Sequence, residues 1–92
     1  MLCSEKILNV YYVYILETVA KGGKKRYYTG YTNDLLRRWT QHRKGKGAKF
    51  CRGKNIELKH FETYITRKEA MRRELEIKSF SKLQKKELIK NN

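Results

Sequence analysis

The chain has 92 residues, no proline and a formal net charge of +14, from 23 Lys and Arg against 9 Asp and Glu. This length suits a modest core, so we expect residues 1–92 to form a single domain. The charge favours a polyanionic partner, of which nucleic acid is the commonest, because each neutralised phosphate releases condensed counterions. The sequence has no run of about eighteen apolar residues, which argues against a membrane-spanning segment.

The cysteine content indicates a reducing compartment. Cys3 and Cys51 are the only cysteines, and no apolar stretch at the N-terminus marks the chain for export. We therefore expect reduced thiols and a cytoplasmic location. A zinc site made of these cysteines with His42 and His60 is disfavoured, because none of the four has the paired spacing of a structural zinc site.

The first part of the chain predicts a β-hairpin. Residues 10–16 read VYYVYIL, a short aromatic and β-branched run typical of a strand that is buried on both faces. Gly22 and Gly23 supply the turn, and the following run, RYYTGYT, again has strand composition. Most of the seven tyrosines lie on these strands, and strand alternation allows only one set of them to face a helix that packs on the sheet.

A helix is predicted next, from about residue 34 to residue 44. Asn33 or Asp34 is the candidate N-cap, and the glycines that follow residue 44 end the pattern. The apolar residues Leu35, Leu36 and Trp39 recur at helical spacing. We expect a buried stripe along Leu35 and Trp39.

Two neighbouring arginines of this helix are not equivalent. At about 100° per residue, Arg38 and His42 lie along the border of the buried stripe, while Arg37 points away. An arginine between helix and sheet can present a fixed guanidinium fork to a phosphate. The alternative is an Arg38 side chain that extends over Trp39 with its charged end in water.

A basic loop is expected after this helix. Residues 43–54 read RKGKGAKFCRGK, which is too rich in glycine and charge for regular structure. Cations of this loop and of the helix before it are our predicted nucleic-acid contacts: Arg37, Arg43, Lys44, Lys46, Lys49, Arg52 and Lys54.

The remainder predicts one strand and two helices. Residues 57–65 suit a third and less buried strand. Thr66 with Glu69 forms a capping box that opens a second helix, and Ser81 with Gln84 repeats this signal after a short break. The expected order is β-β-α-β-α-α, an α+β fold with a small three-stranded antiparallel sheet flanked by helices.

Glu74 is predicted on the apolar face of the second helix. It shares that face with Ala70 and Ile77, whereas Glu76 lies on the opposite side. A buried carboxylate costs several kcal/mol unless a cation, hydrogen-bond donors or a metal ion compensate for the lost water. An ordinary ion pair with Lys78 or a nearby arginine is the alternative to a metal site.

These residues together resemble the GIY-YIG nuclease family. YVY at 12–14, YTG at 28–30 and TNDLLRRWTQH at 32–42 are similar to its motifs, and the resemblance covers nearly the whole chain. The loop at 45–53 and the RRE-containing helix at 72–78 are similar to those of a small, single-domain bacterial branch.

The resemblance implies a metal-dependent endonuclease that hydrolyses DNA phosphodiester bonds, in repair or recombination. It implies a site made of Tyr14, Tyr28, Arg38, His42 and Glu74. Glu74 would hold Mg²⁺ or Mn²⁺, and Tyr14 or Tyr28 would deprotonate or orient the attacking water. Arg38 would neutralise the developing charge, and His42 would relay a proton or position a tyrosine hydroxyl.

Some positions near these motifs raise further expectations. Tyr12 and Val13 stand where the family's first motif has glycine and isoleucine. Tyr31 replaces a small residue after the second motif and is expected to crowd the mouth of the site. Gly30 is expected to leave backbone exposed for the close approach of a ligand.

Two other functions are open on sequence alone. One is a nucleic-acid-binding module that binds through charge and does not cleave. The other is an RNA- or ribosome-associated accessory protein, with Phe50 and the flanking lysines as its contact loop. We assume a monomer and expect DNA rather than RNA as the partner.

Overall fold

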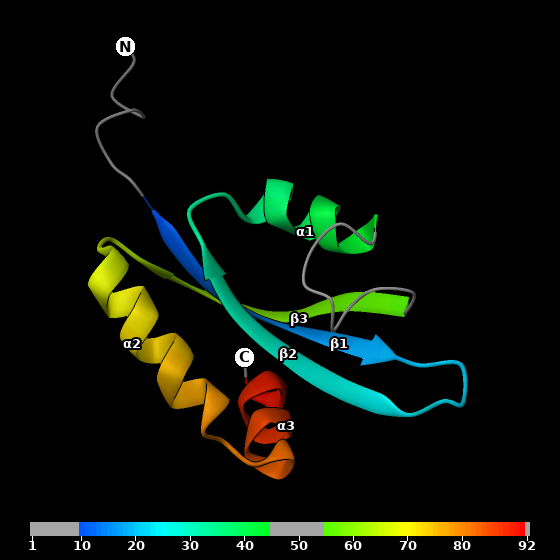
Figure 1. Cartoon of the computed structure of the whole chain (residues 1–92). Coiled ribbons are helices and arrows are strands. Elements are labelled where there is room, and N and C mark those ends of the chain that lie inside the picture. The colour runs from blue at the N-terminus through cyan, green and yellow to red at the C-terminus, as the bar shows by residue number, and fades with distance from the viewer. Residues whose placement is uncertain (1–9, 45–54, 92) are drawn as a thin grey trace.

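The computed structural model describes residues 10–44 and 55–91. Its elements occur in the predicted order β-β-α-β-α-α (Figure 1). The α+β fold expected from the sequence is therefore confirmed. The bounds of the elements are β1 (Tyr11–Val19), β2 (Lys25–Thr32), α1 (Leu35–Arg43), β3 (Asn55–Tyr64), α2 (Arg67–Lys78) and α3 (Lys82–Lys90).

The sheet is antiparallel, with β1 between the two edge strands β2 and β3. Tyr14 of β1 pairs with Gly30 of β2 and with Phe61 of β3. The β1–β2 turn contains Gly23 at a φ of 83°, a backbone region that glycine enters without steric cost. The central strand is buried on both faces, as its composition predicts.

Helices cover both faces of the sheet (Figure 1). On one face α1 packs with Tyr14 and Leu16 of β1, through Leu35 and Trp39. On the other face, α2 and α3 pack over the alternate β1 residues, which include Val13. The edge strand β2 therefore has α1 on one side and α2 with α3 on the other.

The helix boundaries follow the predicted caps. Asp34, rather than Asn33, is the N-cap of α1, Thr66 caps α2, and Ser81 with Gln84 forms a complete capping box at α3. None of these helices in the described part of the chain is long and apolar enough to span a membrane.

The predicted stripe of α1 packs on the sheet, since Leu35 and Trp39 are partly buried against Tyr14 and Leu16. Leu36, which recurs at helical spacing but lies outside this stripe, is 74% exposed. His42, predicted at the border of the stripe, is fully buried. The side of α1 that faces the sheet is therefore rotated toward His42.

Glu62 connects β3 to α2 through a dense set of hydrogen bonds. Its carboxylate accepts two hydrogen bonds from Arg73, at 2.8 and 3.0 Å, and one from the Tyr64 hydroxyl at 2.6 Å. Nε2 of the buried His60 lies 2.8 Å from the same carboxylate. Burial raises the pKa of Glu62, but these partners outweigh burial and lower it to about 2. The hydrogen bonds from Arg73 to Glu62 hold α2 against β3 at the residue before Glu74.

We expect Glu62→Gln to lower the free energy of unfolding by about 2 kcal/mol at neutral pH. The matched control Glu76→Gln removes the more exposed carboxylate bound to Arg73 and should cost less than about 1 kcal/mol.

This contribution of Glu62 depends on pH in a defined direction. The pKa of Glu62 is about 2 in the folded chain and 4.5 for an ordinary glutamate, so the stabilisation is present above pH 4.5 and is lost as the pH falls toward 2. In urea unfolding, the difference in the free energy of unfolding between wild type and Glu62→Gln should become smaller as the pH falls from 4.5 toward 2. Equal losses for the Glu62 and Glu76 variants at neutral pH would contradict this account.

Candidate active site

Tyr14, Tyr28, Arg38 and His42 lie together on the α1 face of the sheet. The tyrosines come from β1 and β2, and the other two residues come from α1. The Tyr14 hydroxyl lies 3.1 Å from Nε2 of His42 in a buried hydrogen bond. The His42 ring centroid lies 5.9 Å from that of Tyr14 and 5.3 Å from that of Tyr28. We call these four residues the tyrosine–histidine cluster.

Gly30 provides the space that the Tyr14 ring occupies. A Cβ atom at position 30 would lie 2.6 Å from the Tyr14 hydroxyl oxygen and 2.9 Å from its Cζ. Unbonded atoms do not approach so closely without displacement, so glycine is needed here. Gly30 is also buried. The expectation that its backbone is exposed for a ligand is therefore wrong, because the ring of Tyr14 covers it.

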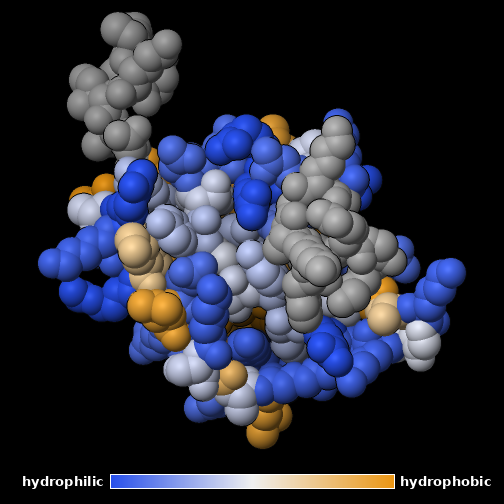
Figure 2. Space-filling model, in the orientation of Figure 1, coloured by the Kyte–Doolittle hydropathy of each residue, from blue (hydrophilic) through white to orange (hydrophobic). Residues whose placement is uncertain are grey.

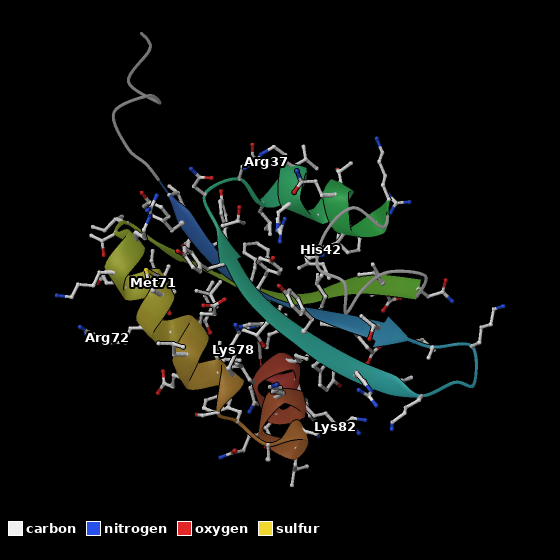
Figure 3. The ribbon with its side chains drawn as sticks, in the orientation of Figure 1. Arg37, His42, Met71, Arg72, Lys78 and Lys82 are labelled. Carbon is white, nitrogen blue, oxygen red and sulfur yellow. The ribbon has the colours of Figure 1, made fainter. Side chains whose placement is uncertain are left out.

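His42 points from α1 toward the sheet, whereas Arg37 lies on the outer side of the helix (Figure 3). Burial lowers the pKa of His42 from its ordinary value, and the charge of Arg38 lowers it further. The imidazole is therefore neutral at pH 7, and its Nε2 can accept the proton of Tyr14. Within the described residues Nδ1 has no hydrogen-bond partner, so the ring is oriented through Nε2.

Arg38 interacts with both tyrosines of the cluster. Burial lowers the pKa of Arg38, but the hydrogen bonds and charge interactions with Tyr14 and Tyr28 outweigh burial and raise it. Its Nη1 also donates to Oε1 of Gln41 at 3.0 Å, which holds the guanidinium in place. Gln41 was not predicted as a site residue; its position three residues after Arg38, on the same side of the helix, is the signal that identifies it.

The predicted nucleic-acid contacts lie around the outer side and the end of α1. Arg37 is exposed and pairs with Asp34 at 3.5 Å, and Lys44 caps the helix. Arg43 lies over the Trp39 ring at 5.9 Å, the place that the alternative interpretation gave to Arg38. Four further predicted contacts lie outside the described residues: Lys46, Lys49, Arg52 and Lys54. Both cysteines also lie outside them.

Glu74 lies in α2, which packs on the face of the sheet opposite α1. Its helical neighbours Ala70 and Ile77 are buried, and its own side chain is 15% exposed, in agreement with the predicted helical face. Oε2 of Glu74 lies 3.4 Å from Nζ of Lys78, so the ion pair considered from the sequence is present. The structure thus does not place Glu74 on the α1 face with the cluster; the edge strand β2 runs between α1 and α2 (Figure 1).

The carboxylate of Glu74 fits a magnesium-type site better than a zinc site. The described residues contain no group of three or more His, Cys, Asp or Glu side chains that could hold a metal ion. Mg²⁺ commonly binds through one or two carboxylates, with water and substrate phosphates as its other ligands. His42 and His60 contact Tyr14 and Glu62 respectively, on opposite faces of the sheet, and so do not form a joint zinc site.

Tyr31 does not crowd the cluster. Its side chain packs on the opposite face of the sheet, against the core that contains Val13. Tyr28 and Gly30 of β2 face α1, and strand alternation turns Tyr31 to the other side. Tyr12, which stands at the first glycine of the motif, has its ring 6.1 Å from that of Phe61.

Comparison with known proteins gives a consistent set of relatives. Residues 10–87 match the GIY-YIG catalytic domain. A UPF0213 protein of Halobacterium salinarum is 42% identical over 81 residues, which cover 87% of this chain and 100% of the relative. A UPF0213 protein of Staphylococcus epidermidis is 39% identical over 83 residues, with 89% and 96% covered. The solution NMR structure of the UPF0213 protein BH0048 from Bacillus halodurans has 39% identity and a TM-score of 0.53, over 90% of this chain and 85% of that one.

Gly30→Ala is expected to lower the free energy of unfolding by about 1–3 kcal/mol, because the added methyl group overlaps the Tyr14 ring. The matched control is Gly22→Ala, where a Cβ meets nothing within 4 Å. Urea unfolding of both variants measures the difference. Combining Gly30→Ala with Tyr14→Phe should recover part of the loss, since it removes the closer of the two contacts. Equal stability of Gly30→Ala and Gly22→Ala would show that position 30 does not determine where Tyr14 lies.

Proposed function

Because the chain belongs to the GIY-YIG family, we propose that it is an endonuclease that uses a divalent metal ion to hydrolyse phosphodiester bonds, with DNA as its substrate. Repair or recombination is the proposed setting, and the cytoplasm the proposed location. The observation that supports the proposal most strongly is the 3.1 Å hydrogen bond between Tyr14 and the buried His42. The proximity of Arg38 to both tyrosines adds to this support.

The Tyr14–His42 pair supplies a base for the reaction. A tyrosine hydroxyl has an ordinary pKa of about 10, so it is protonated at neutral pH and cannot take a further proton from water until it loses its own. Neutral His42 can take the Tyr14 proton at Nε2, and the positive charge of Arg38 favours the resulting tyrosinate. The tyrosinate then takes a proton from, or orients, the water that attacks phosphorus. Tyr28 is the second candidate for this step.

Arg38 is proposed to stabilise the charge that develops on the phosphate. Nη1 of its guanidinium donates to Gln41, and the guanidinium also hydrogen-bonds with Tyr14 and Tyr28. A guanidinium held in this way presents several donors in a plane, which suits the oxygens of a phosphate in the transition state.

Glu74 is proposed to hold Mg²⁺ or Mn²⁺. When bound, such an ion polarises the phosphate and stabilises the leaving oxygen. Glu74 lies on the α2 side of the sheet, and α2 contacts β2 as well as β1. A nucleic-acid backbone that crosses the β2 edge would have Arg38 on one side and Glu74 on the other.

The net charge of the chain agrees with a polyanionic substrate. Figure 2 shows a mainly hydrophilic face, with a paler area of intermediate hydropathy near its centre. The formal charge of +14 favours binding of a phosphate backbone that weakens steeply with salt.

A nucleic-acid-binding module without cleavage is the second candidate. The ion pair between Glu74 and Lys78 supports it, because the lysine satisfies the carboxylate without a metal ion. This function predicts salt-sensitive binding and no cleavage with any divalent metal.

Nicking of supercoiled plasmid with Mg²⁺ or Mn²⁺ tests the proposal. We expect Arg38→Ala and Glu74→Ala each to lower the rate by about 10²–10³-fold, as for removal of one group that stabilises charge in the transition state. The matched controls are Arg37→Ala, which should lose less than about tenfold through weaker binding, and Glu76→Ala, which should retain the wild-type rate. Equal rates for wild type, Arg38→Ala and Glu74→Ala would reject the site.

The pH dependence of cleavage should follow the protonation of His42. Its pKa is lowered below 6.5, and the neutral ring is the form that accepts the Tyr14 proton. The rate should therefore fall by less than half as the pH falls from neutrality to 6.5, and should decline further at lower pH as the ring becomes charged. A single-turnover pH–rate profile measures this decline. A rate already halved at pH 6.5 would contradict the proposed role of His42.

A further inference from the structure

A second cationic site lies on the α3 side of β2, outside the tyrosine–histidine cluster. It is a pocket of about 390 Å³ between the β1–β2 hairpin and α3. Its lining contains five cations and one tyrosine, and no acidic residue: Lys24, Lys25, Arg26, Tyr27, Lys82 and Lys85. We call it the hairpin–α3 pocket.

The positive charge of this pocket is not neutralised by ion pairs. None of its five cations forms a salt bridge with an acidic residue in the described ranges 10–44 and 55–91. Nζ of Lys82 donates to the carbonyl oxygen of Lys25 at 2.8 Å, which connects α3 to the hairpin and leaves two ammonium donors. Two carboxylates lie beside the lining. Glu17 interacts with Tyr27 and lies 3.8 Å from Lys59, and the charge of Lys25 helps to lower the pKa of Glu57.

Lys85 is held in an unfavourable electrostatic environment. Burial lowers the pKa of Lys85, and the charge of Lys78 lowers it further. The fold therefore brings a partly buried ammonium group, which has no salt bridge of its own among the described residues, near Lys78, whose own partner is Glu74. A bound anion would offset both the repulsion and the lost hydration.

The pocket and the cluster are separated by one strand. Tyr27 lines the pocket and Tyr28 belongs to the cluster, because consecutive residues of β2 point to opposite faces of the sheet. In Figure 3, Lys82 lies at the start of α3, near the hairpin end of β2. A nucleic-acid strand that passes over the β2 edge can therefore contact both the pocket and the cluster.

We propose that the hairpin–α3 pocket is a phosphate-binding subsite for the backbone of the nucleic acid, next to the phosphodiester that is cut. The inference rests on the nucleic-acid substrate proposed above. Lysines are point charges that suit a repeating phosphate backbone without reading bases. The pocket positions the substrate and does not take part in the chemistry.

Binding of a labelled DNA duplex, followed by fluorescence anisotropy in EDTA over a range of salt concentrations, tests the pocket without cleavage. The double variant Lys82→Gln/Lys85→Gln should raise Kd about tenfold at about 0.1 M salt and reduce the slope of log K against log salt by about 2. The matched control Lys86→Gln/Lys90→Gln removes the same charge from α3 at residues outside the pocket lining, and should raise Kd less than about threefold.

A second variant keeps the test valid if loss of the Lys82 contact with Lys25 unfolds the chain. Lys24→Gln/Lys25→Gln alters the hairpin side of the same pocket, keeps the Lys25 carbonyl oxygen that accepts from Lys82, and should show the same loss of affinity and slope. An NMR titration of the Lys85 side chain adds an independent readout, because its pKa should rise when the duplex is bound. Free inorganic phosphate should not reproduce this rise if the backbone is the ligand.

Equal losses for the pocket and control pairs would overturn the subsite, since they would mean that only net charge matters. Wild-type binding by both pocket variants would overturn it as well. These outcomes can be distinguished from failure of the proposed function. If the chain binds DNA through the pocket but never cleaves it, the phosphate-binding subsite is supported and the nuclease is rejected. If the chain cleaves DNA and the pocket variants bind as wild type does, the nuclease is supported and the subsite is rejected.

Discussion

The Tyr14 hydroxyl occupies a space that exists because residue 30 is glycine, and in this space it contacts the buried ring of His42. This contact joins the central strand to α1, so it determines which side of the helix faces the sheet. Arg38, one turn before His42, is thereby directed toward Tyr14 and Tyr28. Burial makes each of these polar interactions stronger than it would be in water, and it makes loss of a partner more costly.

The edge strand β2 separates two sets of charged groups with different parts in the proposed reaction. The tyrosine–histidine cluster lies on the α1 side, where His42 is neutral and Arg38 is charged. Glu74 and the hairpin–α3 pocket belong to the side covered by α2 and α3. A nucleic-acid backbone that crosses this edge could contact both sets, which would explain how residues on opposite faces of a small sheet serve one substrate.

The sequence predicted the elements, their order and the helical faces of Arg38 and Glu74, because these follow from local spacing and caps. It did not predict what occupies the space beside Gly30, which depends on the pairing of Tyr14 with that residue across two strands. The same register turns Tyr31 away from the cluster, against expectation. Helical spacing placed Glu74 toward the sheet. The face of the sheet that α2 covers depends on tertiary packing, which no local sequence pattern predicts.

In the proposed function, Arg38 and Glu74 act in the same cleavage reaction from opposite sides of β2. The most direct test is the rate of metal-dependent plasmid nicking by wild type, Arg38→Ala, Glu74→Ala and the double variant under one set of conditions. Residues that act as a unit are not additive, so the double variant should be no slower than the slower single variant. Losses that multiply, or a wild-type chain that does not nick DNA with any divalent metal, would contradict the claim.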